Sequence, residues 1–187
     1  MRRHRNPEHE IPNNTKNQND KAKGKNRASS NVKAQMTTKN NILVRKARGT
    51  DLPAVRKLLE ELVNAMDDTE CIDMRITHQT WERLLKDAGS HFLVATAQGS
   101  PVGLIHFTMR QTVLHRSPSA MIDELVVTKE YQGKGTGKQL VLATIERCKQ
   151  LGCCEVEVST EKSNVKARRF YKKCGFDKTE MLFEVDL

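Results

Sequence analysis

Apolar side chains recur every three or four positions in four stretches of the chain, which is the spacing of one buried helix face. The first stretch runs to Met66 and follows Thr50 or Asp51, either of which suits a helix N-cap. Glycines stand where three of the stretches end, and glycine is a frequent residue at the stop of a helix. The predicted helices cover, in chain order, residues 51–66, 78–88, 140–151 and 164–174.

Shorter stretches between these helices are β-branched or alternate between apolar and polar positions, which predicts strands. Two of them flank Gln98-Gly99-Ser100, a sequence typical of a hairpin turn. Residues 67–75 are expected to form a polar loop. The predicted strands cover residues 42–45, 91–97, 101–109, 121–127, 154–159 and 181–185. The resulting order, β-α-α-β-β-β-α-β-α-β, indicates an α/β domain with one central sheet.

The first 40 residues differ in composition from the rest of the chain. They are rich in Asn, Lys, Ser and Gln and cannot bury enough apolar surface to offset the entropy lost on ordering. We therefore expect a disordered tail over residues 1–40 and one domain over residues 41–187. The tail holds ten Lys or Arg against three acidic residues, a net charge of +7 out of +9, so the predicted domain carries only +2. A flexible basic tail of this kind is expected to make weak contact with nucleic acid.

No apolar run approaches the ~18 residues that a membrane span requires, and the first residues lack the apolar centre of a signal peptide. We expect a cytoplasmic protein without a membrane partner, and a homodimer is compatible with these features. The five cysteines show no metal-ligand spacing, so we expect reduced thiols and no metal. The same absence of spacing leads us to interpret four histidines as core or surface residues, namely His78, His91, His106 and His115. Among them His115, with Arg116 in the loop 111–119, is the best candidate for a substrate contact.

A glycine-rich turn, Gln132-Gly133-Lys134-Gly135-Thr136-Gly137-Lys138, joins the predicted strand 121–127 to the helix that follows. Glycines let backbone N–H groups converge, and the free amides and positive dipole end of the helix face the same point. The turn therefore predicts a pyrophosphate site. Neither the dinucleotide fingerprint nor the P-loop pattern fits, because Lys138 stands where each of them needs a glycine.

The pattern that does fit is [RQ]-x-x-G-x-[GA], formed by Gln132, Gly135 and Gly137. In this pattern the chain resembles the coenzyme A loop of the GNAT superfamily of N-acetyltransferases. The resemblance covers about residues 42–187 and implies the GNAT fold, with a mixed central sheet, and acetyl-CoA as the acyl donor. It also implies that the backbone of the central strand polarises the acetyl carbonyl and pairs with the pantetheine. The residues expected around acetyl-CoA are Leu125, Val126, Val127, Gln132, Gly133, Lys134, Gly135, Thr136, Gly137 and Lys138.

Asn164 and Tyr171 lie seven residues apart and so share one face of the last helix. With Ala167 and Gly175-Phe176 they match a pattern of the same superfamily. Attack of an amine on a thioester expels a thiolate, and a Tyr hydroxyl with a pKa near ~10 can protonate it. The resemblance implies that Tyr171 is the catalytic acid and that both residues contact acetyl-CoA. The alternatives are a core aromatic ring for Tyr171 and a plain N-cap for Asn164.

Asp123 and Glu124 lie in the predicted strand 121–127. An ammonium group must lose a proton before it can attack, and a carboxylate can accept that proton. Adjacent strand residues face opposite sides, so at most one of the two is expected to face a given cleft, and either is a candidate catalytic base. Ile122-Asp123-Glu124 resembles the Ile-Glu-Asp of glucosamine-phosphate N-acetyltransferases, where acidic residues touch the substrate. The alternative is one carboxylate in solvent and the other in a salt bridge.

Together these features predict an N-acetyltransferase that moves acetyl from acetyl-CoA to a primary amine by direct transfer in a ternary complex. A small-molecule amine is the expected acceptor, as in the glucosamine-phosphate enzymes and general bacterial-type small-amine acetyltransferases. The first alternative is a protein lysine or N-terminal acetyltransferase. The second is a catalytically weak acyl-CoA-binding module that its basic tail recruits to nucleic acid. The identity of the acceptor depends on loops that no motif identifies.

Overall fold

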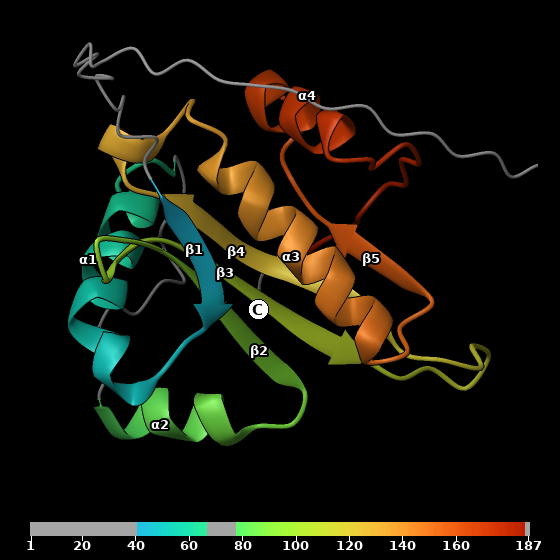
Figure 1. Ribbon diagram of the computed structural model, residues 1–187. Coiled ribbons are helices and arrows are strands. Elements are labelled where there is room, and N and C mark those ends of the chain that lie inside the picture. Colours follow the sequence, from blue (N-terminus) through green and yellow to red (C-terminus); the bar gives the residue numbers. More distant parts are fainter. Residues whose placement is uncertain (1–40, 67–77, 186–187) are drawn as a thin grey trace, which may run out of the picture. The chain divides into compact units, whose positions relative to one another are not determined.

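The computed structural model describes residues 41–66 and 78–185, so the predicted tail and the predicted polar loop lie outside the described residues. Figure 1 shows the described helices and strands in the predicted order, apart from the last strand. The strands are β1 (Ile42–Lys46), β2 (Ser90–Ala97), β3 (Ser100–Arg110), β4 (Ser119–Val127) and β5 (Glu155–Val158). The helices are α1 (Leu52–Val63), α2 (His78–Lys86), α3 (Thr136–Gln150) and α4 (Val165–Lys173), with 3-10 turns η1 (Gly49–Asp51) and η2 (Lys129–Tyr131). None of these helices is long and apolar enough to cross a bilayer.

The five strands form one mixed sheet in the order β1-β2-β3-β4-β5. Strands β1 to β4 pair antiparallel with one another, and β5 runs parallel to β4. The predicted hairpin turn joins β2 to β3, with positive φ angles of 51° at Gln98 and 83° at Gly99. Two central residues with positive φ match the right-handed twist of the strands, so this turn sets the β2–β3 register.

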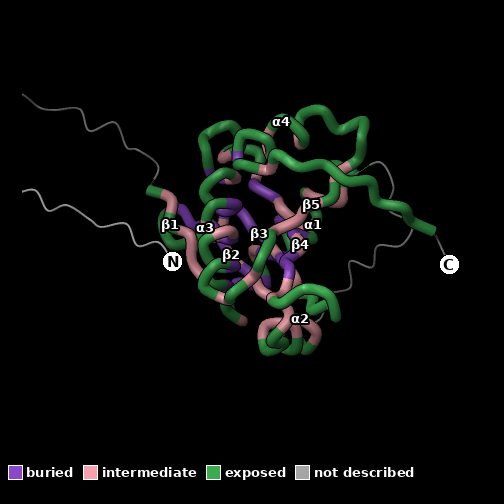
Figure 2. The backbone as a smooth tube through the Cα atoms, turned by 90° about the vertical axis from the view of Figure 1, so that its right-hand side faces the viewer, coloured by how far each residue is buried: buried purple, intermediate pink, exposed green. Residues whose placement is uncertain are grey.

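Two apolar clusters lie on opposite faces of the sheet, as expected for a half-buried strand pattern. On one face, Leu52 and Val55 of α1 and Trp81 of α2 pack against Phe92 of β2. On the other face, Leu140 of α3 belongs to the second cluster. Figure 1 shows α3 lying across the sheet, and Figure 2 shows buried positions, in purple, along the strands between the helices. The sheet therefore has a face that carries α1 and α2 and a face that carries α3.

Asp51 connects the first strand to the first helix through its side chain. Its carboxylate accepts hydrogen bonds of 2.7 and 2.8 Å from the guanidinium of Arg45 and one of 2.8 Å from the backbone N–H of Arg48. Asp51 is the N-cap of α1 by position, but its side chain makes no cap hydrogen bond there. The paired Arg45 holds the pKa of Asp51 below its ordinary value.

The pairing of β4 with β5 ends halfway along β4. The last paired residues are Ile122 of β4 and Val158 of β5, whereas β4 continues to Val127. Among the described residues, 123–127 therefore pair with β3 alone, and we call their other side the open β4 edge. Backbone N–H and C=O groups on such an edge need other partners.

The prediction of a closing strand over residues 181–185 is wrong. These residues form no strand, and the large side chains of Met181, Leu182, Phe183 and Val185 are exposed. A short alternating pattern becomes a strand only where a neighbouring strand offers hydrogen-bond partners over a matching length. The neighbour at this end of the sheet, β5, has only four residues.

Candidate active site

The glycine-rich turn leads from η2 into α3 and exposes a row of backbone amides. Gly133 and Gly135 have positive φ angles of 71° and 87°, and Gly135 is the N-cap of α3. No described backbone carbonyl accepts a hydrogen bond from the N–H groups of residues 133–138. Because these N–H groups lie at the positive end of a 15-residue helix, the turn is suited to bind a phosphate or pyrophosphate.

The polar side chains of this turn take different positions from one another. The amide of Gln132 donates a 2.8 Å hydrogen bond to the carbonyl of Val127, so this side chain fastens the turn to the end of β4. The Nζ atom of Lys134 lies 5.5 Å from the centre of the Tyr131 ring, and Lys138 is exposed. The hydroxyl of Thr136 is buried without a described hydrogen-bond partner. Two exposed lysines therefore accompany the free amides.

Gly137 lies at the point where α4 comes close to the turn. A Cβ atom at this position would lie 3.4 Å from the ring of Phe170 on α4 and 3.7 Å from the side chain of Val127 on β4. These are ordinary van der Waals distances, so α3, α4 and the end of β4 meet at Gly137. The residue after Phe170 is Tyr171, so this contact brings the predicted acid toward the predicted phosphate site.

The ring of Tyr171 packs at its edge against two other aromatic rings. The ring centres of Phe170 and Phe176 lie 5.1 and 5.6 Å away, and all three rings pack against the cluster on the α3 face. Burial raises the pKa of Tyr171 to about 12, and within the described part of the chain the hydroxyl has no hydrogen-bond partner. The hydroxyl therefore stays protonated at any pH near neutrality and is available to a ligand.

Asn164 occupies the N-cap of α4. Its side-chain oxygen accepts a 2.9 Å hydrogen bond from the backbone N–H of Ala167, which is the ordinary role of an Asn at this position. The cap leaves the two N–H groups of the carboxamide for another partner. The predicted contact with acetyl-CoA stays a prediction for Asn164, now restricted to those two donors.

The backbone of residues 125–127 lies along the open β4 edge. The N–H of Thr128 points toward β3, where it donates to the carbonyl of Val102 at 3.0 Å. Since the direction alternates along a strand, the backbone groups of Leu125 and Val127 point toward the open edge and those of Val126 toward β3. Of the three predicted backbone contacts, the geometry thus favours Leu125 and Val127.

A β-bulge brings Asp123 and Glu124 to the same place. His106 of β3 pairs with Glu124, whereas the next residue, Phe107, pairs with Ile122, so Asp123 is an extra residue in β4. The Nδ1 atom of His106 lies 2.5 Å from a carboxylate oxygen of Glu124 and 3.9 Å from one of Asp123. The prediction that at most one carboxylate faces a given cleft is wrong here, because the bulge interrupts the alternation of side chains.

His106 and Ser90 are residues that sequence reasoning missed. The Nε2 atom of His106 lies 2.8 Å from the hydroxyl of Ser90, and the imidazole stacks on the ring of Phe92. The sequence around His106 does not indicate which residues contact its side chain, because these residues lie in two other strands. The bulge that aligns them with His106 is equally invisible in the sequence.

The environment of Asp123 makes its charge costly to the fold. Burial raises the pKa of Asp123, and the nearby Glu124 adds to this, while Thr108 and His106 act in the opposite direction. A folded-state pKa above the unfolded-state value means that this group contributes stability below the unfolded-state pKa. That contribution is lost as the pH rises through the raised folded-state pKa.

We therefore expect Asp123→Asn to unfold at the same temperature as the parent protein, or a higher one, at pH 7. Asn keeps the shape of the side chain and removes a partly desolvated charge, so the difference should close as the pH falls and Asp123 becomes protonated. Thermal unfolding of both proteins between pH 4 and pH 7 checks this. A variant clearly less stable than its parent at pH 7 would show that the carboxylate stabilises the fold.

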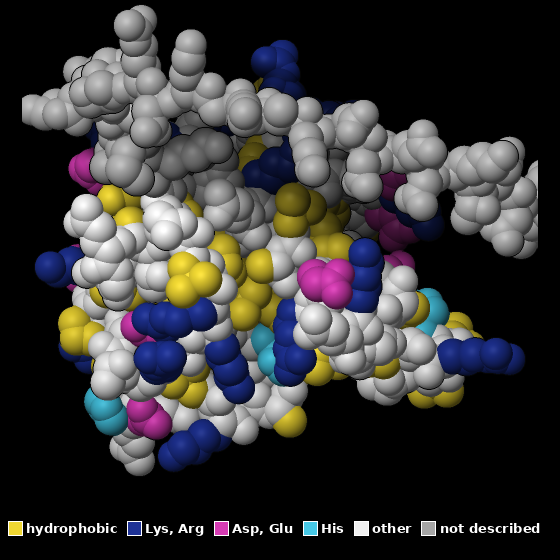
Figure 3. Space-filling model, in the orientation of Figure 1, with side chains coloured by type: hydrophobic (Ala, Val, Ile, Leu, Met, Phe, Trp, Pro, Cys, Tyr) yellow, Lys and Arg dark blue, Asp and Glu magenta, His cyan; other side chains and the backbone are white. Residues whose placement is uncertain are grey.

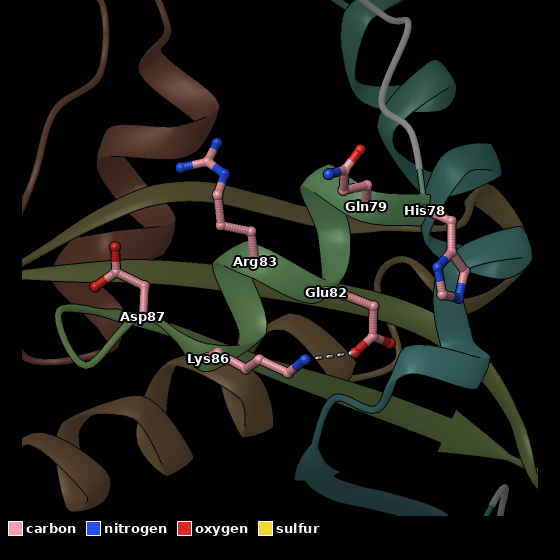
Figure 4. A pocket seen from close by; sticks show the side chains of 6 residues that line it. All are labelled: His78, Gln79, Glu82, Arg83, Lys86 and Asp87. Atoms are coloured by element: carbon pink, nitrogen blue, oxygen red, sulfur yellow. Dashed lines mark ion pairs between the residues drawn. The ribbon is translucent and has the colours of Figure 1, made fainter.

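Two cavities lie outside the predicted site. One, of about 730 Å³, is lined by residues of α2 and by Asp87 just after it, among them the ion pair of Glu82 with Lys86 at 3.9 Å (Figure 4). Because its lining comes from one helix, it is a surface hollow and not a cleft between elements. The other, of about 390 Å³, lies between α3 and strands β1 and β2. Neither cavity is lined by a residue of the predicted site.

Lys and Arg side chains are spread over the face seen in Figure 3, with hydrophobic and acidic side chains between them. Within residues 41–66 and 78–185, no group of three or more His, Cys, Asp or Glu residues is placed to hold a metal ion. The four described cysteines are free, and burial raises the pKa of Cys148 to about 12. The thiol of Cys148 is thus a weak nucleophile at neutral pH.

Comparison with known proteins adds to this geometry. A 61-residue segment is 41% identical to the uncharacterised N-acetyltransferase YvbK of Bacillus subtilis, covering 33% of this chain and 39% of that protein. A 125-residue segment is 26% identical to an aminoglycoside N(6')-acetyltransferase type 1 of Stenotrophomonas maltophilia, covering 65% and 70% of the two chains. The chain thus spans less than half the length of one relative and about two thirds of the other.

The fold is similar to that of glucosamine-6-phosphate N-acetyltransferase from Arabidopsis thaliana. The TM-score is 0.66 at 19% identity, over 78% of this chain and 98% of that one. The sequence profile of the Acetyltransferase (GNAT) family matches residues 54–176, a range that includes the glycine-rich turn, both carboxylates and Tyr171. The predicted fold and family are therefore confirmed, and the chain belongs to the Acetyltransferase (GNAT) family.

Proposed function

We propose that this protein transfers the acetyl group of acetyl-CoA to a primary amine, by direct attack of the amine on the thioester. The observation that carries the proposal is the continuity of the open β4 edge with the free amides at the start of α3. An extended ligand fits these two adjacent features if its amide-containing arm pairs with the open β4 edge and its pyrophosphate binds the free amides. Family membership supports the same donor, since acetyl-CoA is the acyl donor of GNAT acetyltransferases.

The donor site is built mainly from backbone groups. The N–H groups of residues 133–138 would bind the pyrophosphate, and the charges of Lys134 and Lys138 would add to the helix dipole. The backbone groups of Leu125 and the N–H of Val127, whose carbonyl already accepts from Gln132, would pair with the amides of the pantetheine arm and polarise the acetyl carbonyl. Acetyl-CoA supplies the activated acetyl group, and the protein supplies position and electrostatic stabilisation.

The acceptor site would lie on the face that carries α1 and α2. Glu124 lies on the same face as Val126, whose side chain packs with that cluster, whereas Tyr171 packs with the cluster on the α3 face. The carboxylates and the hydroxyl thus approach the open β4 edge from opposite sides. In this arrangement the carboxylates bind the ammonium and remove its proton, while Tyr171 protonates the departing thiolate.

A small-molecule amine is the acceptor class that we favour. The aminoglycoside acetyltransferase to which this chain is similar acts, by its name, on an amino sugar derivative, and two adjacent carboxylates suit a cationic amine. There are two alternatives. The first is acetylation of protein lysines or N-termini, and the second is a weakly active acyl-CoA-binding module.

A panel of acceptors separates these classes. It should contain amino sugars, aminoglycosides, simple alkyl amines and peptides with a free N-terminus or lysine, each assayed with acetyl-CoA and scored by mass spectrometry. We expect N-acetylated product from at least one small amine at a higher kcat/KM than from any peptide. Preferential acetylation of peptides would reassign the acceptor class, and acetyl-CoA binding without any product would favour the binding module.

The predicted tail gives a further test of the domain boundary. We expect a chain that begins at Asn41 to retain its acetyl-CoA affinity and its turnover of a small amine, because no predicted site residue precedes Asp123. Weak, salt-sensitive binding to nucleic acid should be largely lost, since the tail carries +7 of the chain's +9 charge. Steady-state kinetics of both chains and DNA binding at two salt concentrations check this. A selective loss of acceptor affinity in the shortened chain would show that the tail contributes to acceptor binding and that the predicted domain boundary is wrong.

A further inference from the structure

Three side chains form a hydrogen-bonded row across the face of the sheet that carries α1 and α2. A carboxylate oxygen of Glu124 lies 2.5 Å from Nδ1 of His106, and Nε2 of His106 lies 2.8 Å from Oγ of Ser90. The residues come from the adjacent strands β4, β3 and β2. Ser90 is 8% exposed, the His106 side chain 13% and the Glu124 side chain 40%, so the row runs from the interior to an accessible carboxylate.

The position of the imidazole is fixed by its surroundings. The ring of His106 lies parallel to the ring of Phe92, with centres 4.1 Å apart and an angle of 4° between the planes. Phe92 in turn packs edge-on against Trp81, which is 1% exposed. The bulge at Asp123 holds Glu124 opposite His106 in the β3–β4 register. The hydrogen bonds of the row are therefore aligned by the core and not by flexible side chains.

The chemistry of the three groups defines which atom carries each hydrogen. An ionised carboxylate has no hydrogen to donate, so Nδ1 of His106 donates to Glu124. In the neutral imidazole the Nε2 atom then has a lone pair, which accepts the hydrogen of the Ser90 hydroxyl. Only one oxygen of Glu124 takes part in a hydrogen bond with the described residues, so the other oxygen is left for a substrate.

We propose that Ser90 and His106 are positioning residues that hold Glu124 as the base for the acceptor amine. This inference rests on the function proposed above and assigns the base to one of the two candidate carboxylates. In the step concerned, the ammonium of the acceptor transfers one proton to the free oxygen of Glu124. The ammonium becomes a neutral amine, Glu124 becomes a neutral carboxylic acid, and the hydrogen bond from Nδ1 persists. The proton then passes to solvent through the exposed side of Glu124.

The charged groups that face His106 come from β4, and one further titratable group lies behind it on the other face of the sheet. Glu124 and Asp123 of β4 lie on its Nδ1 side, at 2.5 and 3.9 Å. His91 of β2 lies on the other face of the sheet, where its ring stacks on Phe107, and burial lowers its pKa, with Arg147, Lys46 and His106 itself adding to this effect. Two carboxylates beside one imidazole thus form a site of net negative charge that attracts an ammonium.

Two substitutions of His106 separate positioning from packing. His106→Asn places an amide N–H close to the position of Nδ1 and can still donate to Glu124, whereas His106→Gln places its amide nearer to Nε2. We expect His106→Gln to lower kcat/KM for the acceptor by ~10²-fold and His106→Asn by less than ~10-fold, because misplacing a catalytic group by about 1 Å has effects of this size. Ser90→Ala, which removes the hydrogen bond to Nε2, should fall between them.

The pH profile supplies the readout that a structural role would not change. The defect of His106→Gln should be largest where the acceptor is an ammonium and should shrink above the pKa of the acceptor, since a neutral amine needs no base. His91→Gln is the matched control on the opposite face and should show parent-like kinetics. Equal losses in His106→Asn and His106→Gln at every pH would overturn the proposal.

A spectroscopic measurement tests the row without turnover. The N–H of His106 should give a proton resonance far downfield of the amide region in the full chain. The resonance should be absent in both His106→Gln and Glu124→Gln and present in His91→Gln. If the parent protein acetylates no amine, the proposed function fails while this resonance still reports on the row. Absence of the resonance from an active parent protein would overturn the assignment of His106.

Discussion

Tyr171→Phe should lower the turnover of an acceptor amine by ~10²–10⁴-fold and leave the affinity for acetyl-CoA nearly unchanged. Phe fills the space between Phe170 and Phe176 and removes only the hydroxyl, so the fold and the donor site are preserved. The expected loss has a chemical cause. Without a proton donor, the thiolate of coenzyme A is a poorer leaving group, and the acetyl group passes less readily to the amine.

The buried environment of Tyr171 determines the expected pH dependence. Because burial raises its pKa to about 12, the hydroxyl keeps its proton throughout the range in which enzymes are normally assayed. The parent enzyme should therefore show no loss of turnover from ionisation of Tyr171 up to pH 10. Steady-state kinetics between pH 6 and pH 10, with acetyl-CoA affinity measured by calorimetry, check both statements.

The chain's other tyrosine provides the control for this experiment. Tyr131 lies in η2, and Tyr131→Phe also removes one hydroxyl while keeping the ring beside Lys134. We expect parent-like turnover from Tyr131→Phe. Equal turnover of Tyr171→Phe and the parent enzyme at all pH values would mean that water, and not Tyr171, protonates the thiolate.

Gly135→Asp should weaken acetyl-CoA binding by at least ~10²-fold, because it places a negative charge where a pyrophosphate would bind. The φ angle of 87° adds strain, of order 1–2 kcal/mol for a residue with a Cβ atom. The two effects need separation. Calorimetric titration with acetyl-CoA and the thermal shift that it produces measure the first, and the unfolding temperature without ligand measures the second.

Two matched variants provide that separation. Gly135→Ala introduces the strain without the charge, and a Cβ atom at this position has nothing within 4 Å. Gly99→Asp introduces strain and charge at a hairpin turn with a similar φ of 83°, away from the predicted site. Both should bind acetyl-CoA far better than Gly135→Asp. An undiminished thermal shift in Gly135→Asp would show that the phosphate groups of acetyl-CoA do not bind at this turn.

The hydrophobic pattern predicted most of the fold, because the buried face of a helix or strand is determined by the spacing of apolar residues that are close in sequence. The helix assigned to 51–66 begins one residue later and ends at Val63, and Met66, expected in the core, is 47% exposed. The last strand failed because its formation depends on a partner strand, and the partner here is only four residues long. Local sequence predicts an element well when the element is stabilised by its own pattern and poorly when it needs a neighbour.

The candidate site likewise has a part that local sequence predicted and a part that it did not. The glycine-rich turn was identifiable because its function depends on consecutive residues and on the helix that directly follows them. The row of Ser90, His106 and Glu124 was not identifiable, because it depends on the register of three strands and on a bulge at Asp123. The sequence did identify Asp123 and Glu124 as chemically relevant, but their shared position beside His106 is a property of the fold.

We propose that this chain moves acetyl from acetyl-CoA to an amine at the open β4 edge. The most direct measurement is the initial rate of free thiol release from acetyl-CoA in the presence and absence of the best acceptor, with the N-acetyl product quantified in the same samples. We predict release that depends on the amine and matches the product one to one, and that falls by ~10²-fold or more in Tyr171→Phe. Thiol release that is independent of every amine, or absent although acetyl-CoA binds, would contradict the claim.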